Sequence, residues 1–576
     1  MQSCRFPVLT WPIIFLVIFT ACNETGKPGT DNPASENSPW EMRIRHQLEK
    51  HWQQEPANQG FVYDSIDLEC YDLLQFVYKG SGNTAVWSDS GTWQPAAAGM
   101  IHYLENLQES GLFKEKYHYP AISHIKNLLE KDSVKRLDAK LWADADLVFT
   151  DAFMMLLQDL GQGRLQPDSL GWRNDTGKYR NFFEANLARI KKGESPDSIF
   201  RSAEPAHPGY LAIKSKLKGF TDSMDTRVYT YLDYPYKKAD IDDSMHFVKQ
   251  LLIRLKESSI VDKTDGFDSA SLADAIKKYQ VRRKLAADGK ITSSLIKNLN
   301  NTDINKYLRI AVTLDRYKQL PRTMPEDYIF VNLPGFYLQV WESDTIAFTS
   351  RIICGKPETA TPLLTSKINH LVIYPTWTVP ASIIKKEMLP ALKRNAGYLR
   401  KKGLNLYDKD GEPVDPFAVN WEKYSKGIPY KIQQGSGDGN ALGVIKFNFE
   451  NPFAVYLHDT NQRYLFSKQM RALSHGCVRV QEWEKLAFFI AGKDSMQLKS
   501  GDTLRYNRDS ISNWIANKQK QHISVRYQIP LFIRYFGCEV VDGNLKFYDD
   551  IYGEDRKAIE DYFLPGKYSF NKGNEM

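Results

Sequence analysis

At 576 residues, the chain is too long for a single hydrophobic core, and its length predicts roughly three or four domains. A hydrophobic content of 42% with 25% charged residues is ordinary for a soluble globular protein. The net charge of +7 comes from 76 basic and 69 acidic residues, without a dense Lys/Arg stripe interleaved with aromatics. The composition therefore excludes the electrostatic footprint of a nucleic-acid-binding protein and is compatible with an anionic polymer or a membrane surface.

The first 22 residues have the pattern of an export signal. Arg5 supplies a short basic region, and residues 8–19 form an apolar run that is too short to span a bilayer comfortably. The small residues before Cys22 resemble a bacterial lipobox, which implies that this cysteine is lipidated and becomes the mature N-terminus. The alternative is a plain signal peptide with an incidental cysteine. With the polar, flexible tether predicted over 23–39, the mature protein is expected in the periplasm, anchored to the membrane.

Residues 40–225 are predicted to be a mostly helical scaffold domain, because apolar residues recur there at helical spacing. The clearest stretches are 96–107, 137–160 and 182–192. Glycines at the end of the longest stretch are a helix stop signal. No motif in this region carries chemistry, and a connector rich in Tyr, Asp and Lys over 228–245 separates it from the next unit.

Residues 246–300 are predicted to form a small three-helix unit. Its second helix ends in Tyr279-Gln280, and an Asp-Gly turn at Gly289 and a final helix follow. This order resembles the peptidoglycan-binding module, although that family usually has another glycine before Thr292, so the turn here is shorter. A structural spacer is the alternative interpretation.

From Tyr328 onward the pattern changes to short strands of β-branched and aromatic residues separated by turns. We predict a β-rich domain over 326–500 and a C-terminal extension over 501–576 that packs on the scaffold or the β domain. Residues 384–435 interrupt the strands with a short helix and a polar stretch rich in Gly and Lys. This segment is expected to be an inserted capping subdomain, a candidate lid just before the strands that lead to His458. The predicted fold class is therefore multi-domain α+β.

Of the six cysteines, only Cys477 lies among glycine and histidine, in the run SHGCVR. Cys4 leaves with the signal, and Cys354 and Cys538 lie in apolar, strand-like runs where cysteine is usually a small buried hydrophobe. Widely scattered cysteines in a large chain do not form a disulfide framework. Cys477 is therefore the candidate reactive thiol.

A thiol becomes a good nucleophile when a nearby base favours the thiolate. His458 ends an apolar strand nineteen positions upstream of Cys477, where the sheet can hold its ring toward a cleft, and it is the candidate general acid and base. Glycine lets the backbone approach a substrate carbonyl, so the N–H groups of Gly476 and Cys477 could stabilise an oxyanion. The partner that orients His458 stays open between Asp459, His475 and a backbone carbonyl.

Two other interpretations apply to these residues. A cysteine with two histidines could bind zinc, but the CxxC and HxxxH spacings typical of zinc sites are missing. Arg479 is either a solvated charge or a group that binds a substrate carboxylate or assists the developing charge.

The run from Ser474 to Arg479, together with His458, resembles the signature of the L,D-transpeptidase catalytic domain. Further segments that resemble the large periplasmic members of that family are VNLP at 331–334, GKP at 355–357 with TP at 361–362, PTWTVP at 375–380, YLHDT at 456–460, RALS at 471–474 and DIYG at 550–553. The family order of helical scaffold, peptidoglycan-binding module and catalytic β domain with a capping insertion is the order predicted for this chain.

The resemblance implies a ping-pong acyl transfer on peptidoglycan. Cys477 would attack the L,D-peptide bond before the terminal D-alanine of a tetrapeptide stem, release D-alanine and leave a thioester. His458 would accept the thiol proton and then deprotonate the amine of the acceptor stem. The residues expected at the oxyanion and substrate site are Tyr456, Gly476, Ser474, His475, Arg479 and Trp377.

The resemblance also implies that no metal or nucleotide cofactor is needed, because the stem bond itself supplies the energy. The expected partners are peptidoglycan stem peptides, the membrane through the N-terminal lipid, and carbapenems that acylate the cysteine; nucleic acid is not expected. An L,D-carboxypeptidase, in which water resolves the thioester, is an alternative on the same stems. A non-catalytic cell-wall-binding lipoprotein is the alternative from another class.

Overall fold

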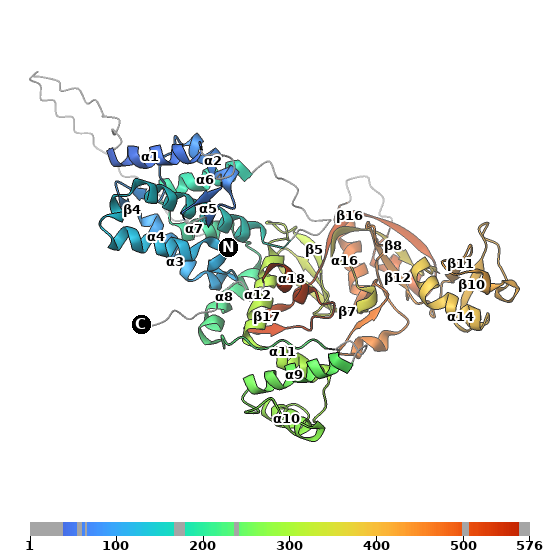
Figure 1. Ribbon diagram of the computed structural model, residues 1–576. Coiled ribbons are helices and arrows are strands. Elements are labelled where there is room, and N and C mark those ends of the chain that lie inside the picture. The colour runs from blue at the N-terminus through green and yellow to red at the C-terminus, as the bar shows by residue number, and fades with distance from the viewer. Residues whose placement is uncertain are drawn as a thin grey trace, which may run out of the picture.

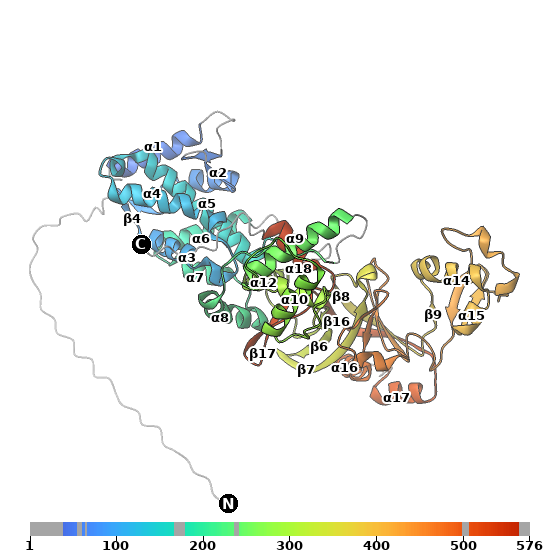
Figure 2. The same ribbon diagram turned by 60° about the horizontal axis from the view of Figure 1, so that its bottom comes forward.

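The computed structural model describes residues 39–53, 60–63, 66–165, 179–234, 241–497 and 506–563. The protein is multi-domain α+β, which confirms the predicted fold class. A helical unit and a small subdomain lie at opposite ends of a central sheet, and a three-helix unit lies on a third side (Figure 1, Figure 2). Cys22 and the predicted signal segment lie outside the described residues. No helix in the described part of the chain is long and apolar enough to cross a membrane.

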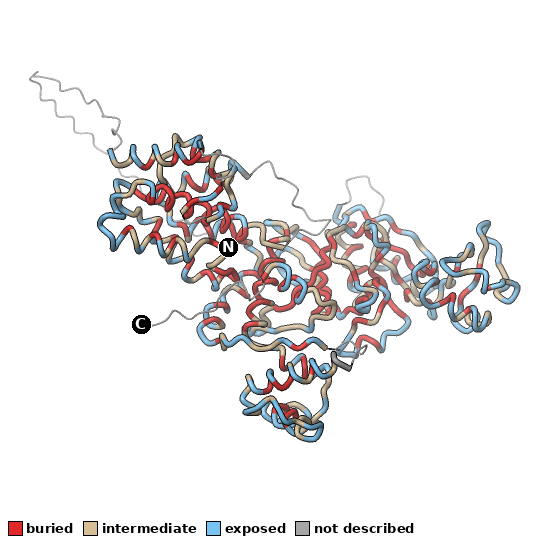
Figure 3. Tube along the Cα trace, viewed as in Figure 1, coloured by how far each residue is buried: buried red, intermediate tan, exposed pale blue. Residues whose placement is uncertain are grey.

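The helices of the N-terminal unit are α1 (Pro39–His51), α2 (Tyr71–Gly80), α3 (Pro95–Glu105), α4 (Tyr119–Lys131), α5 (Ala139–Gln162), α6 (Tyr179–Lys191), α7 (Pro196–Ala203) and α8 (Pro208–Ser223). Two short hairpins lie among them, β1 (Phe61–Val62) with β2 (Ile66–Asp67) and β3 (Ser88–Asp89) with β4 (Thr92–Trp93). α5 is buried along most of its length, and the interior of this unit is correspondingly red in Figure 3. The helix begins at Asp138, whose side chain accepts hydrogen bonds from two backbone N–H groups of the first turn.

Buried carboxylates on α5 hold the surrounding loops. Asp146 accepts hydrogen bonds from the backbone N–H groups of Val86 (2.9 Å) and Trp87 (2.8 Å), and Asp151 accepts one from Cys70 (2.7 Å). A buried carboxylate is tolerated only when it is hydrogen-bonded, so these acids fix how the loops dock against the helix. Their role in this unit is structural.

The three-helix unit consists of α9 (Ile241–Glu257), α10 (Ser269–Arg282) and α11 (Ser293–Asn300) around its own small core, and α12 (Asp303–Tyr317) follows it. The Gln280 side chain accepts a hydrogen bond from the Gly289 N–H (2.9 Å) and donates one to Asp288 (2.8 Å), so it closes the turn noted in the sequence. Gly289 has φ +68°, and a Cβ there would lie 2.9 Å from the Ala273 carbonyl oxygen. The turn therefore requires glycine. Binding of peptidoglycan by this unit stays a prediction.

The central sheet contains β5 (Asp327–Asn332), β6 (Tyr337–Glu342), β7 (Thr345–Gly355), β8 (Leu364–Ile373), β12 (Ile445–Phe449), β13 (Leu457–His458), β14 (Ala472–Ser474), β15 (Val478–Val480) and β16 (Gln521–Arg534). The strand order is β14-β7-β15-β13-β12-β8-β16-β5-β6, and β6 also pairs with β7. Because β7 pairs with β6 over residues 345–351 and with β15 over residues 352–353, the sheet closes into a ring with β14 outside it.

Side chains alternate between the two faces of this ring. Along β12, Ile445 and Phe447 belong to the buried core, whereas Lys446 points to the outer face. In the neighbouring β13, Leu457 belongs to the core. His458 is the register partner of Lys446 and therefore lies on the same outer face as Lys446. The outer face of the ring therefore presents the predicted general base.

The sheet extends beyond the boundary predicted at residue 500. After β15 the chain forms α16 (Trp483–Met496), α17 (Arg508–Ala516), β16, the hairpin of β17 (Cys538–Val541) with β18 (Asn544–Phe547), and α18 (Glu554–Tyr562). β16 lies between β8 and β5 within the ring, instead of packing on it as an extension. The sequence did not indicate this, because the partners of β16 lie far away along the chain and helices precede it.

The inserted subdomain begins before the predicted residue 384. Its three-stranded sheet has the order β10 (Leu404–Tyr407), β11 (Lys431–Gln434), β9 (Trp377–Thr378). The other elements are α13 (Ala381–Ile383), the π-helical turn η7 (Ile384–Met388), α14 (Leu389–Arg394) and α15 (Tyr398–Lys401), packed around a small core of their own. Composition changes only after residue 384, whereas β9 has the sequence of an ordinary strand, so the boundary was predicted too late.

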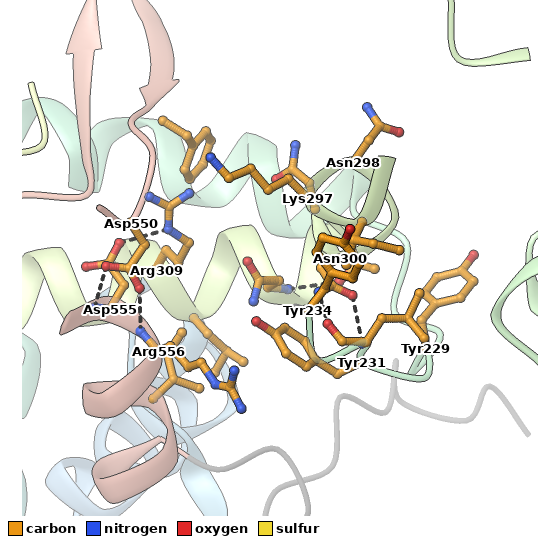
Figure 4. Close-up of a pocket in the computed structure, with 18 of the residues that line it drawn as sticks. Tyr229, Tyr231, Tyr234, Lys297, Asn298, Asn300, Arg309, Asp550, Asp555 and Arg556 are labelled. Atoms are coloured by element: carbon orange, nitrogen blue, oxygen red, sulfur yellow. Dashed lines mark hydrogen bonds and ion pairs between the residues drawn. The ribbon is translucent and has the colours of Figure 1, made fainter. Parts of the chain in front are cut away.

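A cavity of about 1010 Å³ lies where the three-helix unit meets α12 and α18 (Figure 4). Polar side chains pair across this junction: the Lys297 ammonium lies 2.8 Å from Asp549, and Arg556 pairs with Asp233. The cavity lies at the interface between the three-helix unit and the helices α12 and α18, and Cys477 is not among the residues that line it.

A buried ion cluster joins α12 to α18. The carboxylate of Asp555, which is 1% exposed, accepts hydrogen bonds from Arg309 Nε (2.8 Å) and Arg316 Nη1 (2.5 Å). A Cβ at Gly537 would lie 2.0 Å from this carboxylate, so the loop approaches as closely as only glycine permits. Because a buried charge depends on its partners, the cluster fastens the C-terminal helix to the rest of the protein.

Asp555→Asn is expected to lower the free energy of unfolding by about 3 kcal/mol, because the buried Arg316 and the largely buried Arg309 lose the charge of this carboxylate. The matched control is Asp549→Asn, which removes the exposed ion pair with Lys297 and is expected to cost less than about 1 kcal/mol. Urea denaturation followed by tryptophan fluorescence measures both. Equal losses in the two variants would contradict the assignment.

Candidate active site

The motif loop is a tight turn between β14 and β15. Ser474 Oγ accepts a hydrogen bond from the Gly476 N–H (3.1 Å) and donates one to the Cys477 carbonyl (2.6 Å). Gly476 has φ +121°, a backbone conformation that residues with a side chain rarely adopt. The turn therefore depends on this glycine, and it places Cys477 directly before β15.

The segment after β7 holds the turn from a second direction. Thr361 Oγ1 donates a hydrogen bond to the Gly476 carbonyl (2.7 Å), and Thr359 Oγ1 donates one to the Ser474 carbonyl (3.1 Å). The peptide plane between Gly476 and Cys477 is therefore fixed, and the Cys477 N–H makes no hydrogen bond within the described part of the chain. The Gly476 N–H, predicted as a second oxyanion donor, is already engaged by Ser474.

The Cys477 thiol is half-buried and contacts the Tyr456 side chain. Burial raises the pKa of this thiol, while hydrogen bonds from Tyr456 and the charges of Lys446 and Arg479 act to lower it. Burial and the neighbouring thiol raise the pKa of Tyr456, so its hydroxyl keeps its proton. At neutral pH the thiol is therefore protonated, and a base must take its proton before it can attack.

His458 is 4% exposed and lies on the outer face of β13. Burial, together with the charges of Arg479 and Lys446, lowers the pKa of His458 to about 3. The imidazole is therefore neutral at neutral pH, as a general base must be. Its Nδ1 is buried without a hydrogen-bond partner among the described residues.

Tyr456 lies against both predicted catalytic groups. Its hydroxyl hydrogen-bonds the Cys477 thiol, and its ring lies edge-on to the His458 ring, with 5.6 Å between the ring centroids. Within the residues that the structure describes, no hydrogen bond joins the thiol to the imidazole directly.

Two of the three candidates for orienting His458 are engaged elsewhere. The Asp459 carboxylate is paired with Arg463, whose Nη2 lies 2.7 Å away. His475 Nε2 lies 2.5 Å from the Glu387 carboxylate in the inserted subdomain. A backbone carbonyl is the remaining candidate.

Arg479 is half-buried and close to Cys477 and His458. Its Nη1 lies 3.4 Å from Gln462 Oε1, and its Nε is buried without a hydrogen-bond partner among the described residues. Its charge acts on both Cys477 and His458. The guanidinium of Arg479 therefore has a buried Nε and an exposed contact at Nη1, and both interpretations of this residue stay predictions.

The inserted subdomain touches the site at two points. Trp377, in β9, hydrogen-bonds the Tyr456 side chain. The second contact joins Glu387, in η7, to His475 of the motif loop. The subdomain therefore contacts Tyr456 through Trp377 and the motif loop through Glu387.

Cross-strand register explains why these groups gather. His522, Val372, Lys446, His458 and Arg479 form one row across β16, β8, β12, β13 and β15, each residue being the register partner of the next. The imidazole therefore lies between two cations. Lys446 alternates with apolar neighbours in the sequence, which indicates an outward side chain, but its position beside the imidazole follows only from the pairing of β12 with β13.

Two family matches cover separate parts of the chain. Residues 326–497 match the L,D-transpeptidase catalytic domain, and residues 72–217 match the scaffold domain. A curated relative from Haemophilus influenzae, named "Putative L,D-transpeptidase", is 33% identical over 255 residues, which are 44% of this chain and 50% of the relative. The chain thus matches about half the length of that relative.

Solved structures also match part of the chain. The Ldtfm–avibactam carbamoyl enzyme is 12% identical with a TM-score of 0.16, over 37% of this chain and 49% of the other. An L,D-transpeptidase from Mycobacterium smegmatis is 12% identical with a TM-score of 0.17, over 36% of this chain and 58% of the other.

Gly476→Ala is expected to lower the free energy of unfolding by about 1–3 kcal/mol through backbone strain. A Cβ would have room, since its nearest neighbours would lie 3.7 Å away, so the effect isolates the backbone conformation. Gly439→Ala is the control, because it meets no atom within 4 Å and needs no positive φ. Urea denaturation compares the two, and a loss of the same size in both variants would refute the strain argument.

Lys446→Met is expected to shift the pH profile of Cys477 alkylation to higher pH, because the lysine charge lowers the pKa of the thiol. Thiolate is the reacting form, so the rate at pH 7 falls. The measurement is the iodoacetamide rate at Cys477 between pH 6 and about 10, read by peptide mass mapping. Lys446→Arg, which keeps the charge, should leave the profile near that of the wild type; a shift in this variant too would point to packing instead.

Proposed function

Because the chain carries an L,D-transpeptidase catalytic domain, as its motifs predicted, we propose that it cross-links peptidoglycan stem peptides through a thioester on Cys477. The observation that carries the proposal is the environment of this thiol. It lies at a glycine-dependent turn, beside Tyr456, on the sheet face that carries a neutral buried histidine. Such a set of groups suits acyl transfer by a cysteine that is deprotonated during the reaction.

In the first half-reaction, Cys477 Sγ attacks the carbonyl carbon that precedes the terminal D-alanine of the donor stem. His458 takes the thiol proton and delivers it to the nitrogen of the departing D-alanine as the carbon–nitrogen bond breaks. The products are a thioester on Cys477 and free D-alanine.

In the second half-reaction, an amine of the acceptor stem attacks the thioester carbonyl. His458 accepts the proton of that amine and returns it to the sulfur as the carbon–sulfur bond breaks. A new amide forms and the free thiol is restored. Water in place of the amine would give a carboxypeptidase product by the same steps.

Stabilisation of the oxyanion is assigned mainly to the Cys477 N–H. Its peptide plane is held by the hydrogen bond from Thr361 to the Gly476 carbonyl, so the donor is in place before substrate binds. The Tyr456 hydroxyl, which hydrogen-bonds the thiol, is the second donor in this proposal. The Gly476 N–H contributes only if its hydrogen bond to Ser474 breaks.

The proposal includes an exported protein that is held at the membrane by a lipid on Cys22. Its support is the sequence of the first 22 residues alone. Placement near the membrane would bring the site to the cell wall, where the stem peptides occur. Acylation of Cys477 by carbapenems also belongs to the proposal.

Incubation with a carbapenem, or with tetrapeptide stems, is expected to add one acyl group to the wild-type chain in intact-protein mass spectra. Cys477→Ala should form no adduct and no product, because the nucleophile is gone. Cys70→Ala is the matched control and should keep the adduct, since Cys70 is the other half-buried cysteine in the described part of the chain.

The products of this experiment separate the alternatives. Cross-linked dimers with D-alanine release are expected. D-alanine release without dimers would identify a carboxypeptidase. If the wild type formed neither an adduct nor a product, the transfer reaction would be refuted and a wall-binding role would be left.

A further inference from the structure

A pocket of about 260 Å³ lies on the outer face of the ring, beside the candidate catalytic residues. It is lined by His370, Val372, Pro375, Thr376, Lys446, Asn448, Lys520 and His522. These residues come from β8, β12 and the start of β16, and from the segment that leads into β9 of the inserted subdomain. The pocket is therefore bordered by the sheet and by the entry to the subdomain.

The lining carries four basic side chains and no carboxylate. His370 Nε2 lies 3.4 Å from His522 Nδ1, and Lys520 Nζ lies 3.4 Å from Thr376 Oγ1. Neither these side chains nor Lys446 forms an ion pair with any carboxylate in the ranges that the structure describes. Two lysines without a carboxylate partner attract an anion, whereas His370 adds no charge at neutral pH, because burial and the neighbouring His522 and Lys446 lower its pKa.

Lys446 connects this pocket to the chemistry. Its Nζ lies 3.9 Å from the ring centroid of Tyr456, and Tyr456 hydrogen-bonds the thiol. Burial lowers the pKa of Lys446, so a bound anion would stabilise its charge. A group held in the pocket would thus lie next to Lys446, which in turn contacts Tyr456.

The strand order sets the distance from the pocket to the thiol. Neighbouring strands lie ~4.8 Å apart, and β8 lies two strand positions from β13 and three from β15. The middle of the pocket is therefore roughly 10–15 Å from Cys477, which is about the reach of the three residues that precede the scissile bond of an extended tetrapeptide, with a side chain added. The carboxylate of the departing D-alanine is too close to the scissile bond to reach it.

We propose that this pocket is a carboxylate subsite, which binds an acidic residue of the donor peptide upstream of the scissile bond. The inference rests on the proposed acyl transfer at Cys477 and adds to it a determinant of substrate choice. Lys520 and His522 bind the carboxylate, and Lys446 is shared between the subsite and the catalytic residues. Donor peptides with that carboxylate free are selected over those in which it is amidated.

The test measures equilibrium binding of two donor peptides, one with the upstream carboxylate free and one with it amidated. The full chain carrying Cys477→Ala is used, so that binding is read without turnover and without an acceptor. In this background the free acid is expected to bind about tenfold more tightly than the amide. Adding Lys520→Gln should weaken the free acid about tenfold and leave the amide unchanged, and His522→Gln should act in the same direction.

The matched control is Lys518→Gln. It removes the same charge two residues away, from an exposed ammonium that pairs with Asp438 (2.7 Å) outside the pocket, and it should change neither binding constant. Equal binding of the two peptides, no binding of either, or equal effects of Lys518→Gln and Lys520→Gln would overturn the subsite. Turnover of the wild type is measured separately: if binding discriminates but no thioester forms, the subsite stands and the proposed transfer reaction fails.

Discussion

The register between three short strands decides the chemistry of this protein. β12, β13 and β15 pair so that Lys446, His458 and Arg479 stand side by side on the outer face of the ring. A slip of one residue would turn all three side chains into the core and bring Leu457 to the surface. Apolar residues on the inner face of each strand prevent that slip, so the packing of the core holds this row of side chains in place.

This arrangement keeps the resting site unreactive. A histidine between two cations, buried and without a partner at Nδ1, is a neutral base, and the thiol near it stays protonated. Each group changes charge only when the other does, because a thiolate and an imidazolium stabilise each other in a buried site. Tyr456 contacts both groups, so its surroundings change when a proton passes from the thiol to the imidazole.

Local patterns in the sequence predicted the features that depend on local residues. The α+β class, the helical scaffold region and the candidate thiol followed from periodicity and from the run around Cys477. The features that were missed depend on pairing between distant segments. Lys446 lies beside His458 only through the register of β12 with β13, β9 joins the inserted subdomain only through β11, and β16 enters the sheet through partners far earlier in the chain. Spacing along one segment does not contain that information.

The position of β16 has a consequence for how the chain acquires its structure. Leu531 pairs with Ile329 and Gln521 with Ile373, so the ring contains contacts of very long sequence separation. Such topologies fold slowly, because the long segment between the paired strands loses conformational entropy before the strand contacts that compensate for this loss can form. Until β16 arrives, β8 and β5 expose unpaired edges that can join to other chains. A nascent chain that lacks its last tenth therefore lacks β16, and its sheet is still open at β8 and β5.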